Sequence, residues 1–127
     1  MMQIDSAQNK RIGIVEDNDD MQIMYKRMFR KAKNIDIVLQ VSTAEAALEE
    51  IAKANIDLII IDISLPGMDG ITLVRELRMR FPYLKSVIVT AHDREAYESA
   101  SREAGADGFV TKGDGVEMVA TTSRLLF

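Results

Sequence analysis

Apolar runs alternate with segments of helical periodicity along the chain. Residues 12–15, 58–61 and 87–89 are apolar without polar interruption, which predicts strands covered on both faces. Phe109, Val110 and Thr111 predict a short fifth strand. Residues 35–41 alternate apolar and polar side chains, a pattern typical of an edge strand with one wetter face. The chain therefore has five candidate strands.

A helical pattern follows each candidate strand. The helices are predicted from apolar stripes at Met21–Ala32, Ala44–Ile51, Leu73–Phe81, Ala96–Ala104 and Val116–Ser123. Ser42 and Glu45 have the spacing of a capping box, Pro82 ends the third helix, and Asp114 caps the last one. In the last helix we expect Val116, Val119, Ala120 and Ser123 to face inward. Strands that alternate with helices in this way predict an α/β fold, a parallel sheet with helices on both faces.

Length and composition indicate one globular domain. The chain has 127 residues, of which 47% are hydrophobic and 28% charged. We expect residues 1–10 to be a flexible tail and residues 11–127 to form the domain. The formal net charge of −4 does not favour a nucleic-acid surface. No stretch is long and apolar enough to cross a membrane, and the absence of cysteine suits a cytoplasmic protein.

The segment 56–70, IDLIIIDISLPGMDG, contains the strongest local signal. Its apolar centre ends on a carboxylate, Asp62, and Pro66 and Gly67 then supply turn chemistry. A carboxylate at the end of a buried strand lies where open α/β sheets bind their ligands. On this segment alone, Asp62 is equally well explained as a residue that caps the strand.

Polar residues also follow the other buried strands. Glu16 and Asp17 follow the first strand, Thr90 ends the fourth, and Lys112 follows the fifth. Each alone has an ordinary explanation: Glu16 and Asp17 as helix caps, Thr90 as a β-branched strand residue, and Lys112 as a solvated charge. The carboxyl ends of parallel strands meet at one edge, so their joint placement with Asp62 predicts a common site.

Three carboxylates that lie close together repel one another, and this repulsion must be offset. At roughly 5 Å and an effective dielectric constant of about 20, each like-charge pair costs on the order of 3 kcal/mol. A raised pKa or a bound cation relieves this repulsion. An all-oxygen ligand set without cysteine or an evident histidine partner favours Mg²⁺, or Mn²⁺ as a substitute. Lys112 and the hydroxyl of Thr90 are suited to contact phosphate oxygens.

The motifs IVEDN, IIIDISLPGMDG, VIVTAHD and GADGFVTKG occur in the order of a known family. Over residues 11–126 the chain resembles the receiver domain of two-component response regulators. The resemblance implies a single flavodoxin-like (βα)5 domain with strand order 2-1-3-4-5. GADGFVTKG is similar to receivers that precede helix-turn-helix domains, so the chain is either a stand-alone receiver or part of a longer regulator.

The resemblance also implies a role for each site residue. Asp62 is the implied phospho-acceptor, and Asp17 is a direct Mg²⁺ ligand. Glu16 acts through water, and the backbone carbonyl of Ser64 completes the metal ligands. Thr90 and Lys112 contact the phosphoryl oxygens, and Phe109 occupies the position of the switch aromatic.

The implied partners are those of the family. They comprise a sensor histidine kinase or a histidine phosphotransfer protein as phosphoryl donor. The surface of the fourth helix, fifth strand and fifth helix controls an output domain or forms a homodimer. Apart from accepting a phosphoryl group and losing it again, the domain is not expected to be an enzyme. It is not expected to bind nucleic acid or a membrane directly.

One departure from the family pattern, one open question and two alternatives accompany this interpretation. Gly113 follows Lys112 where the family often has proline, which predicts a more flexible loop. His92 occupies a position that modulates dephosphorylation in the family, although a single loop histidine is usually only solvated. A phosphohydrolase of haloacid-dehalogenase type needs a second Asp at the position of Ser64. A pseudo-receiver that does not accept phosphate is disfavoured by the intact set of site residues.

Overall fold

Five parallel strands form one sheet in the order β2-β1-β3-β4-β5, confirming the predicted flavodoxin-like α/β fold. The computed structural model describes residues 9–91 and 94–127. The elements in chain order are β1 (Lys10–Val15), α1 (Asp19–Arg30), β2 (Ile35–Val41), α2 (Ala44–Ile51), β3 (Leu58–Asp62), α3 (Gly70–Arg80), β4 (Lys85–Thr90), α4 (Arg94–Ala104), β5 (Gly108–Thr111) and α5 (Gly115–Leu126).

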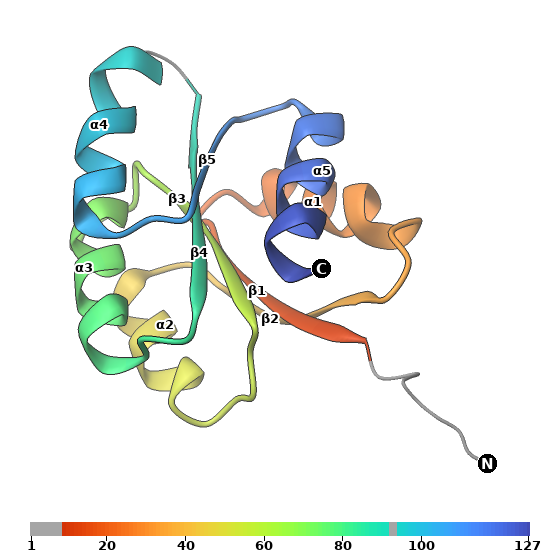
Figure 1. The fold of residues 1–127 in the computed structure, drawn as a ribbon, viewed down its shortest axis with the longest axis horizontal. Helices are drawn as coiled ribbons and strands as arrows, with labels where there is room; N and C mark the ends of the chain where they lie inside the picture. Colours follow the sequence, from red (N-terminus) through yellow and green to blue (C-terminus); the bar gives the residue numbers. More distant parts are fainter. Residues whose placement is uncertain (1–8, 92–93) are drawn as a thin grey trace.

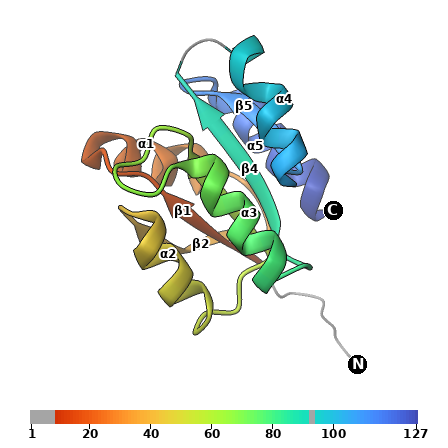
Figure 2. The same ribbon diagram turned by 90° about the vertical axis from the view of Figure 1, so that its left-hand side faces the viewer.

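Helices cover both faces of the sheet (Figure 1). α1 and α5 lie on one face, and α2, α3 and α4 lie on the other, which faces the viewer in Figure 2. Side chains alternate along a strand, so β3 contributes to both cores. Ile60 packs with Tyr25 and Met118 under α1 and α5, whereas Ile61 packs with Leu73 under α3. The central strand is therefore buried on both faces, as its unbroken apolar sequence predicts.

The helices begin at residues whose side chains accept a backbone hydrogen bond. Asn18 caps α1, Asp69 caps α3 and Asp114 caps α5. At α2, however, Thr43 accepts from the backbone N–H of Ala46, so the prediction of a cap at Ser42 was wrong by one residue. The hydroxyl of Thr43 reaches the third residue onward, which is the usual capping distance.

The inner face of α5 also differs from the prediction. Val116 is 84% exposed and Ala120 is exposed, whereas Met118, Thr121 and Thr122 are buried. The apolar atoms of two threonines replace the expected stripe, so counting only apolar residue types shifts the predicted face. Val116 is thus an exposed residue in the first turn of α5.

Two predictions concern residues for which the structure gives little or nothing. Residues 1–8 of the expected tail and His92 lie outside the described residues. Within the rest of that expected tail, Lys10 already begins β1, and the side chain of Asn9 donates to Asp36. Over residues 9–91 and 94–127, every helix is too short or too polar to cross a bilayer.

Candidate functional site

The ends of four parallel strands bring the predicted site residues to one edge of the sheet. β1 is followed by Glu16 and Asp17, β3 ends on Asp62, and β4 ends on Thr90. β5 is followed by Lys112, whose backbone N–H donates to the carbonyl of Thr90 at 2.6 Å. The register of these strands fixes the site, because each polar residue continues a row of buried apolar ones.

Three carboxylates meet at this edge. Glu16, Asp17 and Asp62 each place an oxygen within 4.8 Å of the other two, as needed to hold one metal ion. Glu16 and Asp62 are buried, whereas Asp17 is exposed. The cluster thus has an inner part that is shielded from water and an outer ligand that solvent can reach.

Glu16 is held by two hydrogen bonds to the same oxygen. The backbone N–H of Asn18 donates to Oε2 at 3.1 Å, and Lys112 Nζ donates to Oε2 at 3.4 Å. Lys112 Nζ also lies 3.1 Å from Oε1, an ion-pair contact whose angles do not make a hydrogen bond. Burial, and then the charge of Asp62, raise the pKa of Glu16 to about 7. Uptake of a proton or binding of a cation would offset the cost of keeping the negative charge of Glu16 buried beside Asp62.

Lys112 links the two buried carboxylates. Its Nζ donates to Asp62 Oδ2 at 3.2 Å as well as to Glu16. Burial acts to lower the pKa of Lys112, but the hydrogen bond to Glu16 and the charges of Asp62 and Glu16 outweigh it, so the pKa is raised. Lys112 therefore stays protonated and is positioned to receive an anionic group beside Asp62.

The loop after β3 anchors the other oxygen of Asp62. The backbone N–H of Ser64 donates to Oδ1 at 3.0 Å. Gly67 has a φ of +72°, a conformation that glycine adopts at little cost. A Cβ built on Gly70 would lie 2.6 Å from the carbonyl oxygen of Asp62, so only glycine lets α3 start this close to the strand. The Asp62 carboxylate is thus held by the turn chemistry of its own loop.

Thr90 and Phe109 lie on the adjacent strands β4 and β5. Thr90 is buried at the end of β4 and pairs in register with Thr111. Phe109 pairs in register with Ile88, is 3% exposed, and packs in the core under α3 and α4. The structure therefore places a buried hydroxyl on β4, which is next to the strand that carries Asp62, and a buried aromatic ring on β5, on the far side of β4.

The residues at this edge fit a hard divalent cation. The donor set consists of carboxylate oxygens, and among the described residues the buried Glu16 Oε1 has the ion-pair contact with Lys112 but no hydrogen bond. A buried carboxylate oxygen without a hydrogen-bond donor is stabilised by a cation or a water molecule. Oxygen ligands of this kind suit Mg²⁺, with positions left for water or phosphate.

Three features of the site were not foreseen from the sequence. Gln22 Nε2 donates to the carbonyl oxygens of Glu16 and Val41, at 2.8 and 3.0 Å, which fixes the loop after β1. Gly70 allows the close approach of α3, and Tyr25 is fully buried on the sheet face that also carries Glu16 and Asp62. The glycine at a helix start was a readable signal, whereas the other two depend on contacts between distant segments.

The chain matches the family model for the response regulator receiver domain over residues 12–122. The response regulator GacA of Pseudomonas viridiflava is 28% identical over 117 residues, which cover 92% of this chain and 55% of that protein. The transcriptional regulatory protein DegU of Brevibacillus brevis is 30% identical over 102 residues, which cover 80% of this chain and 43% of that protein. The chain therefore spans about half the length of these curated relatives.

Solved structures agree with the family assignment. A two-component response regulator of the LuxR family from Aurantimonas sp. SI85-9A1 is 28% identical with a TM-score of 0.88, covering 94% of this chain and 86% of that one. The isolated receiver domain of RcsB from Salmonella enterica serovar Typhimurium, solved with the phosphomimetic BeF3⁻, has the same fold at 23% identity, with a TM-score of 0.81, covering 93% of this chain and 99% of that one. The chain therefore belongs to the response regulator receiver domain family of two-component systems.

Proposed function

We propose that this receiver domain accepts a phosphoryl group on Asp62 from a histidine kinase or a histidine phosphotransfer protein. The observation that carries the proposal is the position of Asp62, which is buried beside Glu16 and Asp17 and in contact with Lys112. In the transfer, one oxygen of Asp62 forms a bond to phosphorus as the bond from phosphorus to the donor nitrogen breaks. Water later hydrolyses the aspartyl phosphate and releases inorganic phosphate.

Different residues of this chain would bind the metal ion and the phosphoryl group. Glu16, Asp17, Asp62 and the backbone carbonyl of Ser64 would hold Mg²⁺. Bound there, Mg²⁺ would neutralise charge on the transferring phosphoryl group. Lys112, which already contacts Asp62, would pair with a phosphoryl oxygen, and the Thr90 hydroxyl would donate to another.

The proposed output is a change of surface. A dianion on Asp62 would draw Thr90 and Lys112 inward, and Phe109 would turn into the space that Thr90 leaves. The surface of α4, β5 and α5 would then bind an output domain, or a second copy in a homodimer. The matched segments make up only 55% and 43% of two curated relatives, which supports control of a further domain. We propose no direct contact of this domain with nucleic acid.

The test is intact mass after incubation with acetyl phosphate and Mg²⁺. We expect one labile phosphoryl adduct that is lost in Asp62→Asn and without metal, and kept in Asp19→Asn, a matched change at an exposed neighbouring aspartate. A missing adduct in the native protein calls for a second assay, beryllofluoride binding with Mg²⁺. Failure of both assays overturns the proposal and favours a pseudo-receiver that only binds partners.

A further inference from the structure

β2 is an edge strand, and its outer side pairs with no other strand among residues 9–91 and 94–127. The carbonyl of Asn34 accepts a hydrogen bond from Lys10 N–H at 2.8 Å, and Lys10 pairs in register with Ile35. Hydrogen-bonding directions alternate along a strand, so Asn34 and Asp36 turn towards β1, and Ile35 and Ile37 direct their N–H and C=O groups to the open edge. Such an edge is a template for an added strand.

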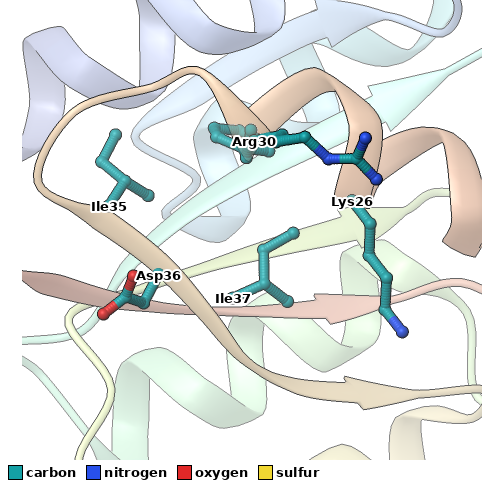
Figure 3. A pocket seen from close by; sticks show the side chains of 6 residues that line it. Lys26, Arg30, Ile35, Asp36 and Ile37 are labelled. Atoms are coloured by element: carbon teal, nitrogen blue, oxygen red, sulfur yellow. The ribbon is translucent and has the colours of Figure 1, made fainter.

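Two cations from α1 stand over this edge. A pocket of about 270 Å³ between α1 and β2 is lined by Lys26, Phe29 and Arg30 of α1 and by Ile35, Asp36 and Ile37 of β2. Figure 3 shows both charged side chains extending beside β2 on the α1 side, whereas the carboxylate of Asp36 points away from them. The open backbone edge and a pair of positive charges therefore belong to one concave surface.

Both cations are exposed and take part in no ion pair within the described part of the chain. Asp36, the nearby acid of β2, accepts hydrogen bonds from Asn9 at 3.1 and 3.2 Å. Lysine beside an edge strand is an ordinary means of discouraging unwanted pairing. The positive charge also discriminates between partners, because Lys26 and Arg30 repel a basic strand and attract an acidic one.

We propose that the open edge of β2 binds an extended segment of a partner protein that carries acidic residues at alternate positions. The acidic side chains would face Lys26 and Arg30 on the α1 side of the added strand. The intervening side chains would face Asp36 on the other side, where an acid is disfavoured. A second copy of this chain paired edge to edge would bring like cations together, so the charges favour a different protein. This site does not depend on phosphorylation.

The probe is the peptide acetyl-Thr-Glu-Val-Glu-Val-Thr-amide, titrated into the ¹⁵N-labelled, unphosphorylated protein and followed by NMR. We expect shift changes centred on β2 and slower hydrogen exchange at the amides of Ile35 and Ile37. The double variant Lys26→Glu/Arg30→Glu should weaken binding by about tenfold or more. Arg27→Glu/Lys31→Glu changes the net charge equally at exposed residues outside the pocket, and should leave affinity within about twofold.

A second peptide tests the register without any change to the protein. Acetyl-Thr-Glu-Glu-Val-Val-Thr-amide has the same composition but places its acids on opposite faces of a strand, so we expect it to bind clearly more weakly. Equal binding of the two peptides, equal weakening by both double variants, or shifts away from β2 would each overturn the proposal. The same applies if sedimentation shows that the edge is occupied by a second copy of the chain.

Discussion

Lys112 Nζ lies 3.2 Å from Asp62 Oδ2, although the two residues are 50 positions apart in the chain. The contact exists because β3 and β5 are parallel, flank β4 and end at the same edge of the sheet. Lys112 also binds Glu16, so one cation holds two buried carboxylates. This pair places a positive charge beside the proposed acceptor before any phosphoryl group arrives.

Replacing Lys112 should therefore slow phosphoryl transfer. In Lys112→Gln we expect the rate of labelling by acetyl phosphate to fall by about 10²–10³, because a preorganised donor to the transferring group is lost. Rates come from intact mass at timed intervals, with saturating Mg²⁺. Lys85→Gln removes an exposed lysine at the start of β4 and should label at the native rate. Native kinetics in Lys112→Gln would contradict the proposed contact with the phosphoryl group.

Mg²⁺ should stabilise the fold through the acidic cluster. A ligand that binds only the folded state at 100 times its dissociation constant adds about 2.7 kcal/mol to the free energy of unfolding. Urea unfolding with Mg²⁺ and with EDTA measures this gain. We expect Asp17→Asn to lose most of it, since Asp17 is the exposed carboxylate of the cluster, and Asp19→Asn to retain it. If Mg²⁺ raises the free energy of unfolding equally in both variants, the metal binds at a site other than the acidic cluster.

The gathering of Glu16, Asp62 and Lys112 was predictable from the residue pattern. Each of them follows or ends a predicted strand, and parallel strands end at a common edge. The five-strand order itself came from the family resemblance, because periodicity alone does not say which strands are neighbours.

Other features could not be predicted from the sequence pattern, because they depend on tertiary packing. The burial of Thr121 and Thr122 in α5 depends on packing against the sheet, which residue type does not reveal. The place of Tyr25 near the acidic cluster depends on how α1 lies over β1 and β3. Likewise, Lys26 and Arg30 form a common surface with β2 only when α1 packs beside the open edge.

Metal-free protein should lose stability as the pH rises towards neutrality. The pKa of Glu16 is raised from 4.5 to about 7 in the fold, mainly by burial, so between these values the folded state holds a proton that the unfolded state has released. The contribution of Glu16 to stability is thus full below pH 4.5 and is lost as the pH passes 7. We therefore expect the free energy of unfolding of Glu16→Gln, measured with urea in EDTA, to rise relative to that of the native protein between pH 4.5 and 7. A constant difference between the two proteins would contradict the raised pKa.

Tyr25→Phe should stabilise the protein. Its hydroxyl is buried without a hydrogen-bond partner among the described residues, and its pKa is raised, first by burial and then by the charges of Glu16 and Asp62. Removing an unsatisfied buried hydroxyl should add about 1 kcal/mol to the free energy of unfolding. Tyr83→Phe, at a residue 94% exposed, is the matched control and should change little. A loss of stability in Tyr25→Phe would mean that the hydroxyl has a partner, such as a buried water.

Gly70→Ala should disturb the acceptor without touching any charged group. Its Cβ would meet the Asp62 carbonyl oxygen at 2.6 Å and the Ile63 Cα at 2.9 Å, and backbone atoms cannot give way as a flexible side chain does. We expect a loss of about 1–3 kcal/mol in urea unfolding, typical of overpacking, together with slower labelling of Asp62. Gly115→Ala is the matched control, because that glycine also begins a helix but its Cβ would only contact Met28 at 3.4 Å. If both variants lose stability equally, the loss comes from replacing a glycine at the first residue of a helix and not from the contact of Gly70 with Asp62. If Gly70→Ala is stable and labels normally, the close approach of α3 to β3 does not position Asp62.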